Sequence, residues 1–345
     1  MSRADDVHHT FLPFGNPFKN IFSWGSHLSP KLLTLLNDFE LKLSTSLKSL
    51  IPKESSEILG LSWMIKAVES ISEIHKDIKD LITVLQFPLS DWDEKWIDVY
   101  LESSVNLLDV CIALILELSR LDRGRLLLQY ALHILDPLRN RPSTDQLKRA
   151  ESTLRGWTKQ FDSKNPKLES CYSTLCELAK TLFLGKVKNS SKGKVLIRAL
   201  YGVMVETIFV SSIIMAELSG WSKPPIELHV PDKFSWHKAF DELQGSIIAA
   251  ATTAAHNSSR KMLLFKELEA VGMCVGRLIE EGERLQELVV ELGEKAEKLS
   301  GGLEILSNKI DDFFQIVLSG RDALLYNLRE GNEEKIESNS TIRVD

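Results

Sequence analysis

The sequence has few cysteines and no excess of basic residues, and each shortage argues against a class of protein. Four cysteines in 345 residues are too few for a disulfide framework, and their spacing matches no zinc-binding pattern. The formal net charge is −6, which argues against general affinity for nucleic acid because phosphate binding needs a basic surface. We therefore expect no nucleic-acid partner and four small core cysteines in a reducing compartment: Cys111, Cys171, Cys176 and Cys274.

Short motifs that mark common enzymes are also missing. Gly193-Lys194 is not a phosphate-binding loop, because Lys188 stands where the first glycine is needed and Val195 where Ser or Thr is needed. The chain contains no dinucleotide-binding glycine fingerprint, no His-Glu-x-x-His pair and no Gly-x-Ser-x-Gly elbow. We therefore predict no catalytic residue, no metal and no cofactor. An enzyme of signal metabolism with an unrecognised site is an alternative that the sequence leaves open.

Targeting signals are equally sparse. No apolar run follows Met1, so no secretory signal is predicted, and the acidic pair Asp5-Asp6 with little serine differs from an organellar transit peptide. We expect a cytoplasmic protein, either free or peripheral on an endomembrane or the plasma membrane. The plastid is the less favoured compartment.

The N-terminal residues 1–28 are predicted to form a partly disordered aromatic and Pro-containing arm, in which Pro13, Gly15 and Pro17 prevent a regular helix. Its apolar side chains either pack into grooves of the helical body or dock on a membrane interface or a partner, and we favour packing. The candidate docking residues are Phe11, Phe14, Phe18, Phe22 and Trp24.

Apolar residues recur at three- and four-residue steps through most of the chain, which predicts long amphipathic helices and no strand. Ser29-Pro30 is a typical helix start, and a break is expected near Gly124. The fold class is therefore all-α, an elongated bundle of long amphipathic helices. The expected segments are a helical bundle at 29–220, a Pro-rich connection at 221–233, C-terminal helices packed on the same bundle at 234–330 and a disordered tail at 331–345.

The most apolar segment is a predicted helix at 195–219, within which Ala199 to Ala216 carries one charged residue, Glu206. Such a helix is either the innermost helix of a large core or a membrane span. Glu206 would cost about 2.5–3.5 kcal/mol at the centre of a bilayer on insertion scales. Because several amphipathic helices are available to cover the segment, we predict a buried central helix.

The last third of the chain has the most regular pattern. Apolar residues from Leu268 to Leu328 follow the alternating three- and four-residue spacing of a coiled-coil seam. The pair Gly301-Gly302 interrupts that seam. We predict a coiled-coil-like C-terminal helical hairpin that turns, or at least kinks, at this pair.

A basic cluster precedes the central helix and contains no acidic residue. It is either a solvated loop ahead of a helix or a contact for anionic lipid or a partner, where each basic residue contributes about 1 kcal/mol at an anionic surface. We favour the solvated loop. The cluster consists of Lys186, Lys188, Lys192, Lys194 and Arg198.

Four blocks of the sequence resemble the plant BYPASS family. They are FLPFGNPFKNIFSWGSHLSPKLLTLLNDFELKL (11–43), HKDIKDLITVLQFPLSDWDEKWIDVYLESSVNLLD (75–109), KNSSKGKVLIRALYGV (188–203) and FFQIVLSGRDALLYNLR (313–329). The resemblance implies a plant protein of root and shoot development that restrains production of a root-derived mobile signal. It implies no catalytic residues, and it leaves plastid, endomembrane and plasma membrane open as compartments.

The sequence thus favours a non-enzymatic developmental regulator or adaptor with protein partners that remain to be identified. The first alternative is a membrane-peripheral trafficking or lipid-contact protein that uses the aromatic arm and the basic cluster. The second alternative is the enzyme of signal metabolism.

Overall fold

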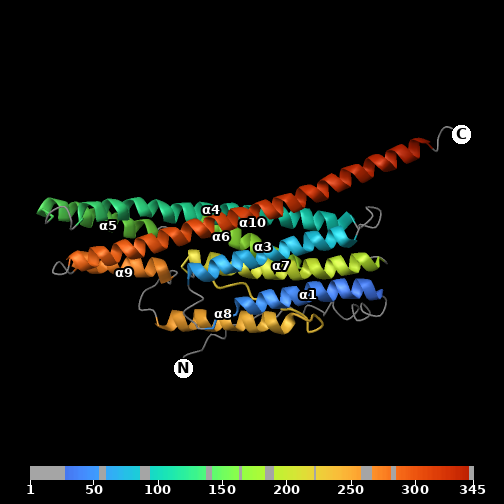
Figure 1. Cartoon of the computed structure of the whole chain (residues 1–345), viewed down its shortest axis with the longest axis horizontal. Helices are drawn as coiled ribbons and strands as arrows, with labels where there is room; N and C mark the ends of the chain where they lie inside the picture. Colours follow the sequence, from blue (N-terminus) through green and yellow to red (C-terminus); the bar gives the residue numbers. More distant parts are fainter. Residues whose placement is uncertain are drawn as a thin grey trace, which may run out of the picture.

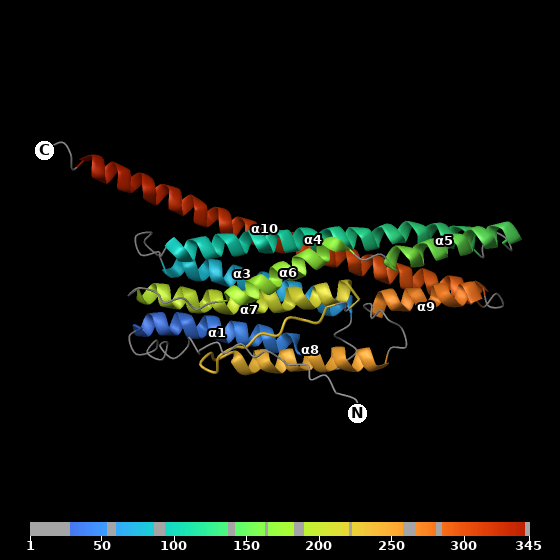
Figure 2. The same cartoon turned by 180° about the vertical axis from the view of Figure 1, so that it is seen from behind.

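The computed structural model describes residues 28–53, 60–85, 94–136, 142–162, 165–182, 190–220, 223–257, 266–280 and 285–341. Within these ranges the chain forms nine α-helices and no strand, which confirms the predicted all-α class. The helices lie side by side along the long axis of an elongated bundle (Figures 1 and 2). The helices are α1 (Pro30–Leu50), α3 (Leu61–Leu85), α4 (Glu94–Ile134), α5 (Thr144–Asp162), α6 (Pro166–Thr181), α7 (Ser191–Leu218), α8 (His237–Asn257), α9 (Lys266–Glu280) and α10 (Leu285–Thr341).

Several helices begin where the sequence carries a start signal. The Ser29 side chain accepts a hydrogen bond from the Leu32 amide, and Pro30 occupies the first turn of α1. Asn165 caps α6 in the same way, again with a proline in the first turn. Ser190 caps α7 by accepting from the amide of Gly193. Local sequence therefore sets these three boundaries.

Helix α7 lies at the centre of the bundle and packs against α1, α3 and α6. Its most apolar window is 94% buried, so its apolar surface is covered by protein, as predicted. Aromatic rings pack along it, with Phe209 against Phe240 of α8 at 5.1 Å and Tyr201 against Phe234 at 5.0 Å between ring centroids. Burying such large side chains contributes about 1.5–3 kcal/mol each. This helix organises the core.

The segment between α7 and α8 is irregular over residues 223–236, as its prolines predict. It is nevertheless tied to both helices. The Ile226 amide donates to the Ser212 hydroxyl of α7, and Gln244 of α8 bonds both the amide and the carbonyl of Leu228. These side chains satisfy backbone groups that have no helix or strand to pair with.

The predicted turn at Gly301-Gly302 is wrong, because α10 runs through this pair as a single helix of 57 residues. Gly302 lies against Leu61 at the start of α3, whose Cδ1 atom is 2.6 Å from where a Cβ would stand. Packing along α3 and α4 outweighs the roughly 1 kcal/mol by which a glycine weakens a helix. A C-terminal hairpin is present, but α9 and α10 form it, and α10 has already begun at Leu285.

Two further boundaries differ from the prediction. No break occurs at Gly124, which is buried inside the continuous helix α4. The tail predicted to be disordered from residue 331 is helical as far as Thr341. Adding residues to an existing helix avoids the unfavourable nucleation step, so a polar segment rich in Glu can continue α10. In both views the end of α10 projects beyond the other helices (Figures 1 and 2).

Candidate functional site at the start of the central helix

The basic cluster lies partly at the start of α7. Lys192 and Lys194 are half-buried in the first turn of the helix, next to the cap Ser190. Lys186 and Lys188 lie outside the described residues. The aromatic docking residues Phe11, Phe14, Phe18, Phe22 and Trp24 also lie outside them.

Arg198, the last member of the cluster, turns into the bundle. Its Nη2 donates to Glu40 Oε2 of α1 at 3.2 Å and to the backbone carbonyl of Lys233 at 3.0 Å, and its Nε donates to Glu40 Oε1. The guanidinium carbon also lies 4.9 Å from the ring centroid of Phe234. Arg198 is therefore bonded inside the protein. The described members of the predicted contact for anionic lipid or a partner are then Lys192 and Lys194.

Glu40 is the centre of this internal contact and is only 2% exposed. Besides the arginine, it accepts hydrogen bonds from the amide and the hydroxyl of Ser235, at 3.2 and 2.7 Å. A buried carboxylate is tolerated only when donors surround it in this way. The group joins α1, α7 and the irregular segment before α8.

A cavity of about 50 Å³ lies between the first half of α4, the end of α6 and the first half of α7. Its lining is apolar apart from hydroxyl groups such as those of Ser103 and Thr181. Burial raises the pKa of a third lining hydroxyl, Tyr201, to about 12. This volume is well below the roughly 300–1,000 Å³ of typical small-molecule sites.

Glu206 in the middle of α7 is fully buried and faces two serines. Its Oε1 accepts from Ser70 Oγ of α3 at 2.5 Å and from Ser46 Oγ of α1 at 3.3 Å, whereas its Oε2 has no hydrogen-bond partner within the described part of the chain. Burial raises the pKa of Glu206 to about 7, although the serine hydrogen bonds act in the opposite direction. Near neutral pH this carboxyl is therefore partly protonated, which is how an acidic residue is accommodated on an apolar helix.

A second buried carboxyl, Glu217, lies at the end of α7, and neither of its oxygens has a hydrogen-bond partner among the residues that the structure describes. Burial raises its pKa well above the ordinary value, and the nearby charge of Glu267 acts in the same direction. Glu267 itself accepts from the Leu61 amide at 3.1 Å and so caps α3 from another helix. Protonation of Glu217 removes the cost of an unpaired buried charge.

His75 on α3 makes a hydrogen bond through Nε2 to the Thr207 hydroxyl at 3.0 Å, and its ring meets Phe313 edge-on. Burial lowers the pKa of His75 to about 4, so the ring is neutral near pH 7. His75 is therefore a polar group whose hydrogen bond is made inside the bundle. Among the described residues, no group of three or more His, Cys, Asp or Glu side chains is placed to hold a metal ion.

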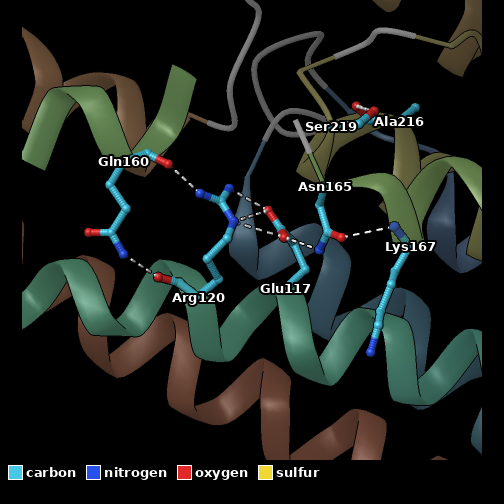
Figure 3. A network of polar contacts seen from close by, with 7 residues as sticks. All are labelled: Glu117, Arg120, Gln160, Asn165, Lys167, Ala216 and Ser219. Atoms are coloured by element: carbon cyan, nitrogen blue, oxygen red, sulfur yellow. Dashed lines mark hydrogen bonds and ion pairs between the residues drawn. The ribbon is translucent and has the colours of Figure 1, made fainter. Parts of the chain in front are cut away.

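A separate polar network joins α4, α5 and α6 (Figure 3). Glu117 is buried and accepts from Arg120 at 2.6 Å and from the Asn165 amide group at 2.7 Å. Gln160 of α5 exchanges hydrogen bonds with Arg120, donating to its carbonyl while its own carbonyl accepts from the guanidinium. Because Asn165 also caps α6, the network fixes where the chain enters that helix.

Sequence reasoning did not identify these contacts. Glu40, Glu117 and Glu206 each have a partner outside their own helix and distant in the chain. The one signal available was an acidic residue at an apolar helical position, which marks a buried carboxyl but not its partners. The described residues thus define an all-α bundle protein whose buried polar groups hold helices together.

Comparison with known proteins places this bundle in a plant family. The chain is 46% identical to Protein BPS1, chloroplastic, from Arabidopsis thaliana over 343 residues, which are 99% of this chain and 97% of that protein. It is 52% identical over 278 residues to UPF0496 protein 4 from both indica and japonica rice, which covers 81% of this chain but only 60% of the rice proteins. The chain belongs to the BYPASS family of plant proteins. No family model and no solved structure matches it.

Proposed function

We propose that this protein is a non-enzymatic regulator of root and shoot development that acts as an adaptor and restrains production of a root-derived mobile signal. The observation that carries the proposal is its identity to Arabidopsis BPS1 along nearly the full length of both chains. The adaptor role is supported by the interior, where Glu40, Glu117 and His75 are bonded to other parts of the bundle. Because these polar groups are used inside the bundle, we expect partner proteins to bind the outer faces of the helices.

Complementation of Arabidopsis plants that lack BPS1 tests this proposal. The chain is expressed either in roots alone or in shoots alone, and protein accumulation is checked by immunoblot. We expect root expression to restore shoot growth, because a protein that restrains a root-derived signal acts where the signal is made. Rescue by shoot expression alone would contradict the mobile-signal role, and no rescue from either tissue would contradict the developmental role.

The second candidate function is contact with membrane lipid. It is supported by Lys192 and Lys194 at the start of α7 and by the second helix that is long and apolar enough to span a bilayer, Asp98–Ile134, whose apolar window is only 39% buried. Peripheral binding follows the anionic lipid content of vesicles, since each basic residue contributes about 1 kcal/mol.

Vesicle flotation with and without anionic lipid tests this second function. If it holds, replacing the four lysines 186, 188, 192 and 194 by alanine abolishes flotation on anionic vesicles. A matched control replaces four exposed lysines elsewhere, Lys148, Lys159, Lys167 and Lys238. Equal loss in both variants, or no flotation of the wild type, rejects a specific lipid contact.

For the compartment, we propose the cytoplasm, with peripheral contact to an endomembrane or the plasma membrane. The name of the Arabidopsis relative assigns that protein to the chloroplast, which makes the plastid the alternative. An import assay with isolated chloroplasts decides between them. Cytoplasmic residence predicts full digestion by added protease, whereas a protected, shortened product would establish import.

A further inference from the structure

Helix α4 exposes a regular row of mostly apolar side chains that the bundle does not cover. The exposed members include Leu116 at 40% and Leu126 at 62%. The row advances in alternating three- and four-residue steps, which is the spacing of a coiled-coil seam. We call it the α4 seam, and it consists of Val105, Asp109, Ile112, Leu116, Ser119, Arg123, Leu126 and Tyr130, all of them exposed.

The other sides of α4 are covered. Helices α10, α5 and α6 pack against it, and α4 lies along one edge of the bundle in both views (Figures 1 and 2). Single exposed apolar residues are common on protein surfaces and need no explanation. A row with helical periodicity is different, because a stripe confined to the two seam positions matches the width of one partner helix.

The charges within the seam indicate which helix fits. Asp109 and Arg123 are exposed and have opposite sign, and each lies about two helical turns from Leu116, one on either side. Within the described part of the chain, neither forms an ion pair. Two copies of α4 placed antiparallel and centred on Leu116 would therefore bring Asp109 of each copy opposite Arg123 of the other.

Three of the apolar members also match in this arrangement. Leu116 meets its own counterpart at the two-fold axis, and Val105 of one copy lies beside Leu126 of the other. A two-fold contact requires a surface that is complementary to itself. Asp109 and Arg123, which have opposite charge and lie at equal distances from Leu116, give the seam that property, while Ile112 lies beside the polar Ser119 of the other copy. We propose that two copies of this chain associate through their α4 seams in an antiparallel, two-fold arrangement.

The size of the seam sets the strength of this association. From Val105 to Tyr130 it is about 38 Å long at 1.5 Å per residue and about 10 Å wide, or roughly 400 Å² per copy. The total of about 800 Å² is below the roughly 1,200 Å² of stable complexes, so the dimer is weak and reversible. It is present at high protein concentration and dissociates on dilution.

Sedimentation velocity of the full chain at about 1 and 100 μM tests the proposal, with a Kd expected in the micromolar range or above. The wild type should shift toward dimer at the higher concentration, and Leu116→Lys should stay monomeric. Leu41→Lys is the control, because Leu41 is equally apolar and 66% exposed but lies on α1. Far-UV circular dichroism confirms that each variant is folded.

A charge exchange makes the test specific to the proposed register. Asp109→Arg places two arginines opposite each other at both ends of the dimer, and Arg123→Asp places two aspartates there. Each variant alone should therefore associate at least about tenfold more weakly than the wild type. An equimolar mixture of the two variants should recover the dimer, since every contact then pairs opposite charges.

Three results would overturn the proposal. The wild type could remain monomeric at 100 μM, the dimer could persist in both charge variants, or the mixture could fail to recover it while both variants are folded. Vesicle flotation of Leu116→Lys identifies the competing occupant. If the wild type is monomeric and this variant no longer floats on vesicles, the seam contacts lipid and does not bind a second copy.

Discussion

At the scale of single residues, the buried carboxyl groups of α1, α4 and α7 decide how the helices meet. Glu40 and Glu117 are each paired with an arginine. Among the described residues, Glu206 has serine hydroxyls as its hydrogen-bond partners and no basic partner, so its charge is not compensated there. The two kinds of carboxyl should respond differently to mutation, because removing a partner from a buried charge costs more than neutralising a charge that is already disfavoured.

Neutralising Glu206 should stabilise the protein at alkaline pH. Its pKa in the folded protein, about 7, lies above the ordinary value of 4.5, so stability is lost as the pH rises through this interval. At 1.36 kcal/mol per pKa unit, the free energy of unfolding that is lost above the folded-state pKa amounts to about 3 kcal/mol. Glu206→Gln should therefore exceed the wild type in free energy of unfolding at pH 8 but not at pH 4.5, as measured by urea denaturation.

Comparing the wild type with Glu206→Gln isolates the titration of Glu206. His75, whose pKa is lowered, is present in both proteins and contributes equally to both pH profiles. Glu73 is the acidic neighbour whose charge adds to the raised pKa of Glu206, and it is also unchanged. Glu102→Gln, at an exposed position of α4, is the matched control. A difference between Glu206→Gln and wild type that does not change with pH would contradict this prediction.

Removing the partner of Glu40 should be strongly destabilising. Arg198→Ala leaves a carboxylate that is 2% exposed without its counter-charge, at a cost of about 3–5 kcal/mol. The double variant Glu40→Gln/Arg198→Met should lose much less, since no unpaired charge remains. Urea denaturation of both variants measures the difference, and equal loss in the two would show that the ion pair is not the cause.

At the scale of helices, α10 shows how packing overrides local preference. Adjacent glycines predict a break, yet the helix passes through both of them while contacting α3 and α4. The two glycines have different surroundings. A Cβ at Gly301 would meet nothing within 4 Å, whereas one at Gly302 would approach Leu61 to 2.6 Å.

The two alanine substitutions should therefore have different effects. Gly301→Ala should stabilise the protein by up to about 1 kcal/mol through helix propensity. Gly302→Ala gains the same propensity but crowds the buried Leu61, and overpacking costs about 1–3 kcal/mol. Thermal and urea denaturation should rank Gly301→Ala above wild type and Gly302→Ala below Gly301→Ala. Equal stabilisation by both would contradict the close approach of α10 to α3.

At the scale of the whole molecule, the bundle is elongated because its long helices lie side by side and α10 extends past one end. Deleting residues 331–345 should therefore change the free energy of unfolding by no more than about 0.5 kcal/mol, because changes at the protein surface usually have effects of this size. It should also reduce the total far-UV helical signal per molecule. An unchanged helical signal would contradict a helical tail.

The sequence by itself determined the all-α class, the capped start of α1 and the burial of the central helix. These follow from period, capping residues and apolar content, which are local or nearly local properties. The family resemblance could also be found from the sequence alone, because it rests on blocks of residues in order.

Only the tertiary structure decided that α10 continues through Gly301-Gly302, that Arg198 pairs with Glu40 and which residues bond Glu206. Each depends on a contact between residues that are distant in the chain, such as Gly302 with Leu61 or Ser70 with Glu206. The α4 seam belongs to the same group. Its spacing is present in the sequence, but only the packing of α5, α6 and α10 shows which face of α4 remains uncovered.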